Sequence, residues 1–163
     1  MMHSPKDIRM KDDAILIEPA ERDDLPAMIA ILREGQVAPK DAWSEADAPA
    51  YLAAFDEMAA DPRYALLVAR DEGGAVLGML QLNFSRALPD HGALKAILES
   101  VFVAEAARGR GIGRLLVAEA ERRAQARGAR RVQLTSNKVR LDAHRFYRTL
   151  GYTQGHEGFS KSL

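Results

Sequence analysis

The sequence predicts an α/β (α+β) fold, in which about four helices pack on both faces of a mixed, mostly antiparallel sheet of six to seven strands. Short apolar runs alternate with segments in which apolar residues recur at helical spacing. In the middle of the chain, the apolar runs 64–70 and 75–84 flank a polar turn with two glycines and predict a hairpin. A chain of 163 residues, of which 47% are apolar, suffices for one core. We therefore expect a single domain at 14–163 after a flexible tail at 1–13.

The first half of the chain predicts a strand, two helices and the hairpin. Residues 14–18 have strand composition, and a helix is expected over 21–34, with Asp23 or Asp24 as its N-cap and Gly35 at its end. An alanine-rich stretch predicts a second helix over 47–60, which ends before Pro62. After the hairpin, a turn at 89–92 leads into a strand at 93–103.

The second half contains the clearest helix of the sequence. Apolar residues recur at helical spacing from Ile112 to Ala124, and Gly128 follows, so a helix is expected over 111–127. Residues 130–135 predict a short strand, and residues 141–150 predict a helix that Gly151 ends. The closing segment 152–163 is expected to add one or two strands.

Composition excludes several classes of protein. No cysteine is present, which excludes disulfides, a thiolate nucleophile and cysteine-bound zinc. No segment has the roughly 20 apolar residues of a spanning helix, and residues 1–13 lack the apolar core of a signal peptide, so we expect a cytoplasmic protein. Residues 1–100 carry a net charge of −8 and residues 101–163 a net charge of +8. The basic half therefore suits a polyanionic ligand.

A glycine-rich turn in the basic half predicts an anion site. The run 108–113, Arg-Gly-Arg-Gly-Ile-Gly, lies between the strand that ends at Val103 and the helix that begins near Gly111. Glycines let the backbone approach a ligand, and the first N–H groups of a helix have no partner within the helix. The Gly-Lys-Ser/Thr of a phosphate-binding P-loop is absent, and the glycine spacing differs from that of a dinucleotide-binding turn. An ordinary turn with solvated arginines is the alternative.

Four segments together resemble one family. Arg108-x-x-Gly111-x-Gly113 matches the acetyl-CoA signature of the GNAT superfamily of N-acetyltransferases. Segments 98–103 and 134–137 resemble its fourth strand and the end of its fifth, and 143–152 resembles its A-x-x-F-Y-x-x-x-G-F/Y helix. The closing part is most similar to aminoalkylphosphonate N-acetyltransferase-like members. The resemblance implies a GNAT fold, acetyl-CoA as co-substrate, transfer of an acetyl group to a primary amine of a small molecule in a ternary complex, and a homodimer.

The resemblance also implies roles for particular residues. Glu99 would order the water that takes the ammonium proton, and Tyr147 would protonate the coenzyme A thiolate. By periodicity alone, Tyr147 is a core residue, and Glu99 could form an ion pair at a strand end. Asn137 could bind the pantetheine arm or hold a turn, and Ser136 is a weaker candidate of the same kind. The expected cofactor-binding residues are Val101, Phe102, Val103, Arg108, Gly109, Arg110, Gly111, Ile112, Gly113, Arg114, Asn137 and Tyr147.

The acceptor is expected on the acidic side of the sheet, near the first two helices and the turn after Phe84. The candidate acceptor residues are Trp43, Tyr51, Asp90 and His91, with Asp41 and Glu45 beside them. An acceptor that carries a phosphonate would require Arg33, Arg63 or Arg86 to converge there. The histidines lack the spacing of metal ligands, so no catalytic metal is expected.

Three other functions remain open from sequence. A peptide amine could replace the small molecule, and the fold could bind coenzyme A without catalysis. A nucleic-acid-binding module would use the eight arginines between Arg108 and Arg131. Glu119 and Glu121 interrupt that run, and no aromatic residue lies within it, so we expect no nucleic-acid partner and no membrane partner.

Overall fold

A computed structural model describes residues 14–163, so the predicted tail at 1–13 lies outside the described residues. Within the described part of the chain, five strands form one sheet in the order β1-β2-β3-β4-β5. Their bounds are β1 (Leu16–Pro19), β2 (Tyr64–Arg70), β3 (Val76–Arg86), β4 (Leu94–Val103) and β5 (Arg131–Leu134). Neighbouring strands are antiparallel except β4 and β5, which run parallel. This confirms the mixed, mostly antiparallel sheet.

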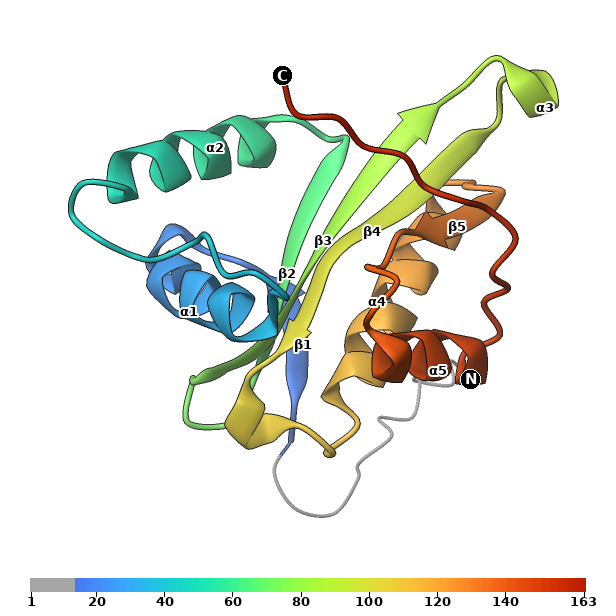
Figure 1. The fold of residues 1–163 in the computed structure, drawn as a ribbon. Coiled ribbons are helices and arrows are strands. Elements are labelled where there is room, and N and C mark those ends of the chain that lie inside the picture. The colour runs from blue at the N-terminus through green and yellow to red at the C-terminus, as the bar shows by residue number, and fades with distance from the viewer. Residues whose placement is uncertain (1–13) are drawn as a thin grey trace, which may run out of the picture.

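Five α-helices of residues 14–163 surround the sheet, one more than expected. They are α1 (Leu25–Gly35), α2 (Ala48–Ala60), α3 (Pro89–Gly92), α4 (Ile112–Ala126) and α5 (Leu141–Thr149), with single 3-10 turns η1 (Arg22–Asp24) and η2 (Glu105–Ala107). The additional helix is α3, a single turn in which Asp90 and His91 have φ near 60°, so this segment remains the turn that the sequence predicts. Figure 1 shows α1 and α2 on one side of the sheet and α4 and α5 on the other.

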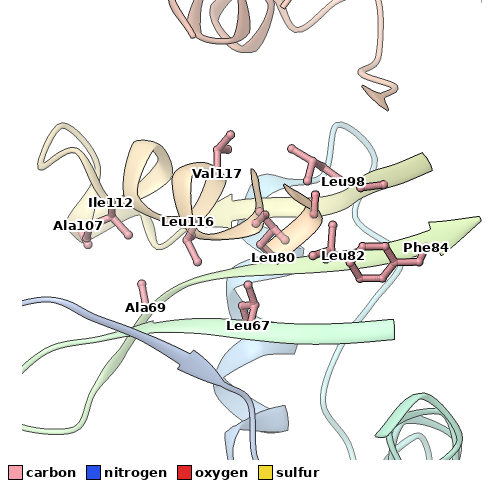
Figure 2. Packing of buried hydrophobic residues seen from close by; sticks show 13 residues of the cluster. Leu67, Ala69, Leu80, Leu82, Phe84, Leu98, Ala107, Ile112, Leu116 and Val117 are labelled. Carbon is pink, nitrogen blue, oxygen red and sulfur yellow. The ribbon is translucent and has the colours of Figure 1, made fainter. Parts of the chain in front are cut away.

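The core lies between the sheet and α4. Ile112, Leu116 and Val117 of α4 are buried against strand residues that include Leu80 and Leu98 (Figure 2). Their spacing of three and four residues places them on one face of the helix, as the sequence predicts. On the other face of the sheet, Met28 and Ile31 of α1 pack in a second cluster with Val68 and Met79. Successive residues of a strand point to opposite faces of the sheet, so membership of one cluster or the other shows which face a strand residue occupies.

The expected sheet of six to seven strands was too large, because the segment 152–163 forms no strand. Its side chains are exposed except for that of Tyr152, and Phe159 is 97% exposed. Gly155 and Gly158 interrupt the segment, and no backbone ladder with another described strand is formed. A strand is stabilised by its partner, and here the described chain supplies none.

Candidate active site

The strands β4 and β5 separate in the middle of β4. Their ladder ends at the pair Leu98 and Leu134, whereas β4 stays paired with β3 as far as Val103. Glu99 pairs with Gln81 and Phe102 pairs with Met79, so two residues of β4 lie opposite Leu80 alone, and the first of them, Ser100, has φ 50°. This bulge bends β4 away from β5. The edge of residues 99–103 that faces β5 is left without a strand partner, and its backbone N–H and C=O groups can bind a ligand.

The glycine-rich turn lies next to this opening. Gly109 and Gly111 have φ near 80°, and a Cβ at either position would meet no atom within 4 Å. Gly111 precedes α4, whose first N–H groups point out of the helix. Arg108 donates through Nε to the carbonyl oxygen of Val103 at 3.3 Å, which ties the turn to the end of β4. The turn therefore combines open space, positive charge and a helix N-terminus, which fits the pyrophosphate of a nucleotide cofactor.

Two polar residues follow β5 at the other wall of the opening. The Ser136 hydroxyl is buried and has no hydrogen-bond partner in residues 14–163. The Asn137 side-chain oxygen accepts a hydrogen bond from the Val139 N–H at 3.1 Å. The backbone carbonyl oxygen of Asn137 accepts another from the Arg140 N–H at 3.0 Å. Asn137 thus holds a turn in this structure, while Ser136 is the side chain that a cofactor amide would satisfy.

Tyr147 is held by aromatic contacts. Its ring packs edge to face against Phe146 at 5.1 Å and against Tyr152 at 5.7 Å. No hydrogen bond joins its hydroxyl to the described chain. Burial raises the pKa of Tyr147, and the Arg140 guanidinium partly opposes that rise. The phenol is therefore protonated at neutral pH, as a proton donor must be.

Sequence reasoning missed the contacts that hold α5 in place. The Tyr152 hydroxyl donates to Glu121 of α4 at 2.8 Å, and a Cβ at Gly113 would lie 3.3 Å from the Phe146 ring. Arg140 lies 5.3 Å above the ring of Phe102, which packs against Gly35 of α1. In the sequence, only the Gly-Tyr pair after α5 points to such a contact, through Tyr152. The other contacts join residues that are far apart in the chain, so their spacing gives no signal.

Glu99 lies on the opposite side of the sheet from α4. Its neighbour Leu98 is buried in the α4 cluster, so alternation places Glu99 and Ile97 on the side of α1 and α2. Strict alternation along β4 would place Val101 on the Glu99 face as well, but Val101 packs against the α4 cluster. The bulge at Ser100 interrupts the alternation. Glu99 is exposed and makes no ion pair with the described residues.

The structure brings together part of the predicted acceptor set. Trp43 stacks on Tyr51 with ring centroids 6.1 Å apart, and the Tyr51 hydroxyl donates to Asp41 at 2.8 Å. Burial and that carboxylate raise the pKa of Tyr51. Asp90 and His91 lie in α3, at the tip of the β3–β4 hairpin and far from the loop between α1 and α2 (Figure 1). Asp90 pairs with Arg130 at 3.4 Å.

The three arginines proposed for an anionic acceptor do not converge. Arg33 donates to the Asp41 carbonyl oxygen at 3.3 Å, Arg63 pairs with Asp61, and Arg86 donates to the Gly92 carbonyl oxygen at 2.6 Å. Arg33 lies near the end of α1, Arg63 just before β2 and Arg86 at the end of β3. Each is engaged locally, so recognition of an anionic acceptor requires other residues.

Several arginines of the basic half are also engaged within the molecule. Arg122 and Arg123 bind Glu119 at 2.8 and 2.7 Å, and these hydrogen bonds lower the pKa of Glu119 to about 2. Arg127 lies 4.0 Å above the ring of Phe84. Such internal contacts leave fewer charges for a nucleic-acid backbone.

Two cavities lie at the start of β2, apart from the opening between β4 and β5. Their volumes are about 270 and 430 Å³, and both are lined by Tyr64, Ala65 and Arg123. None of the predicted catalytic or cofactor residues lines them. Residues 14–163 contain no group of three or more side chains that could hold a metal ion and no helix long and apolar enough to cross a membrane.

Comparisons with known proteins agree with this geometry. The sequence profile of the Acetyltransferase (GNAT) family matches residues 25–152. An aminoalkylphosphonate N-acetyltransferase from Salmonella typhimurium is 35% identical over 120 residues, which cover 74% of this chain and 77% of that protein. A solved structure of a transcriptional regulator from Bacillus halodurans has a TM-score of 0.86 and 36% identity, covering 92% of this chain and 100% of that one. A putative acetyltransferase from Agrobacterium tumefaciens has a TM-score of 0.79 and 27% identity, covering 91% and 99%. The predicted resemblance is confirmed.

Proposed function

The chain belongs to the acetyltransferase (GNAT) family, and we propose that it transfers the acetyl group of acetyl-CoA to the primary amine of a small molecule by direct attack in a ternary complex. The opening between β4 and β5 carries this proposal. One end of the opening meets the glycine-rich turn, and Glu99 lies beside the bulge at Ser100 that creates it. The opening therefore connects an anion site with a carboxylate that an amine can reach.

Acetyl-CoA is the co-substrate, and it supplies a thioester carbonyl carbon that an amine can attack. The turn 108–114 and the first N–H groups of α4 would bind its pyrophosphate. The open edge of residues 101–103 would pair with its amide groups, with Ser136 on the opposite wall. Backbone N–H groups of that edge would also stabilise the negative charge that develops on the carbonyl oxygen.

Two side chains would move protons. Glu99 takes a proton from the ammonium group through a water molecule, which leaves a neutral nitrogen able to attack. The new C–N bond forms as the C–S bond breaks, and Tyr147 donates its phenolic proton to the departing thiolate. The raised pKa of Tyr147 supports this role, because the donor is fully protonated at neutral pH. The second proton of the attacking nitrogen passes to the Tyr147 phenolate and restores the phenol, and Glu99 releases the first proton to solvent.

The acceptor is a small molecule in this proposal. The relative at 35% identity acts on aminoalkylphosphonates by its name, so these compounds are the first acceptors to test. No contact described above favours a peptide acceptor. A homodimer and a cytoplasmic location stay predictions.

The test measures thiol release from acetyl-CoA with a panel of amines, for wild type, Tyr147→Phe and Glu99→Gln. We expect an active amine and a loss of kcat of about 100-fold to 10,000-fold in both variants, with acetyl-CoA still bound. Tyr64→Phe at the start of β2 and Glu57→Gln on α2 are matched controls and should retain activity. Acetyl-CoA binding without release by any amine, or full activity in both site variants, would contradict the mechanism.

A further inference from the structure

The sheet face beside Glu99 carries a row of polar side chains. Register and alternation place six polar residues, with Ile97 among them, on the face away from α4, because the alternate residues Leu82, Ala96, Leu98 and Val132 belong to the α4 cluster. We call this row the polar strip, and its members are Glu99, Gln81, Asn83, Gln133, Lys95 and Arg131.

Neither helix on that side covers the polar strip. Helix α1 packs on Val68, Met79 and Phe102, and α2 packs on β2. Gln81, Asn83 and Lys95 are accordingly half-buried, while Glu99, Gln133 and Arg131 are exposed. The strip is therefore a polar part of the sheet that α1 and α2 leave open to a ligand, on the same face as the proposed proton acceptor.

Charge is ordered along the strip. Glu99 stands at one end, beside the bulge, and Lys95 stands four residues back along regular β4, about 13 Å away at about 3.3 Å per residue. Arg131 is the partner of Lys95 on β5, so two cations lie on neighbouring strands about 4.8 Å apart. Neither forms an ion pair within residues 14–163. Adjacent like charges repel, so an anion bound between them is favoured.

The two amide side chains between the ends of the strip follow the same order, with a free acceptor near Glu99 and a free donor nearer to Lys95. The Gln81 side-chain nitrogen donates to the Asn83 side-chain oxygen at 2.9 Å. This bond leaves the Gln81 oxygen to accept from an ammonium group, next to its cross-strand partner Glu99. It leaves the Asn83 nitrogen to donate to an anion, at the position opposite Ile97 and nearer to Lys95.

We propose that the polar strip binds the acceptor and selects a zwitterion, with the amine at Glu99 and Gln81 and an anionic group such as a phosphonate at Lys95 and Arg131. Lys95 and Arg131 have long side chains whose charged ends can approach the Glu99 end of the strip, so a zwitterion with a short aliphatic chain can contact both ends. This inference rests on the proposed acetyltransferase function and deepens it by assigning the acceptor site. It replaces Arg33, Arg63 and Arg86 as the residues that would recognise the anion.

The experiment compares aminoethylphosphonate with propylamine, which has an amine of similar reach and no anion. For Lys95→Gln, and more strongly for Lys95→Gln with Arg131→Gln, we expect kcat/KM for aminoethylphosphonate to fall about 10-fold to 100-fold, mainly through KM. The kcat/KM for propylamine should fall much less, so the preference for the zwitterion is lost. Lys161→Gln, on the exposed closing segment, removes the same charge outside the strip and should preserve the preference.

Two readouts separate the inference from the function on which it rests. Titration calorimetry with acetyl-CoA and thermal unfolding show whether each variant is folded and binds the cofactor. If amines are acetylated but the variants lower kcat/KM equally for both acceptors, or not at all, the inference is overturned and the acetyltransferase function stands. If no amine is acetylated by wild type that binds acetyl-CoA, the proposed function fails and the inference fails with it.

Discussion

Tyr147 owes its position to ring contacts and its protonation state to burial. Phe146 and Tyr152 pack edge to face against it, and Tyr152 is fixed by its hydrogen bond to Glu121. Burial raises the pKa of the phenol, whereas the Arg140 cation stabilises the phenolate and acts against that rise. At the scale of single residues, the aromatic contacts and one cation therefore set the chemistry of the proposed acid.

Substitution Arg140→Gln tests this balance. Removing the cation raises the pKa of Tyr147 further, so the proton donor stays protonated to higher pH and the alkaline limb of kcat should move to higher pH. The pH profile of kcat at saturating acetyl-CoA measures the shift. The control is Arg145→Gln, because Arg145 is an exposed residue of α5, the helix that carries Tyr147. This substitution should leave the alkaline limb in place. An alkaline limb that persists unchanged in Tyr147→Phe would assign it to another group.

At the scale of elements, the end of α1 supports β4 beside the bulge. Gly35 is the last residue of α1, and a Cβ there would overlap the Phe102 ring, so only glycine allows this approach. Phe102 in turn lies beneath Arg140. A helix on one face of the sheet thus fixes a strand residue of the proposed cofactor site and, through it, the turn before α5.

Substitution Gly35→Ala should displace Phe102 and loosen this support. We expect the free energy of unfolding to fall by about 1–3 kcal/mol, because overpacking forces the ring and β4 to shift. Affinity for acetyl-CoA should fall as well. Urea unfolding and calorimetric titration measure the two effects. Gly155→Ala is the matched control, since a Cβ there meets no atom within 4 Å. Equal effects of the two substitutions would contradict the packing argument.

At the scale of the whole molecule, the two halves of the sequence supply different elements of the fold. The acidic half supplies α1, α2 and most of the sheet, whereas the basic half supplies the glycine-rich turn, α4 and α5. The closing segment adds nothing to the core, since its side chains after Tyr152 are exposed. The predicted homodimer would be the means by which this segment is buried.

Removal of residues 156–163 tests the contribution of the closing segment. For a segment that buries no side chain within its own chain, we expect Tm to change by less than about 2–4 °C, which corresponds to about 1 kcal/mol for a chain of this size. Thermal unfolding measures Tm, and analytical ultracentrifugation of both forms measures mass. A larger fall in Tm, together with conversion of a dimer to a monomer, would show that a second copy buries the segment.

The sequence by itself determined the local elements and the place of the glycine-rich turn before α4. The strand 64–70 has the predicted bounds, α4 buries the predicted stripe, and the glycine-rich turn meets a helix N-terminus as expected. These features depend on residues close together in the chain, whose spacing and backbone freedom are visible in the sequence. The family resemblance added the candidate roles of Glu99 and Tyr147.

Only the tertiary structure decided how distant residues meet. The bulge at Ser100, the face of Val101 and the pairing of Lys95 with Arg131 depend on the register between strands, and one extra residue moves every later side chain to the other face. The closing strands were expected from composition but do not form, because a strand requires a partner that local sequence cannot provide. The helices and strands could thus be predicted from residues close together in the chain, whereas the polar strip arises from pairing between strands.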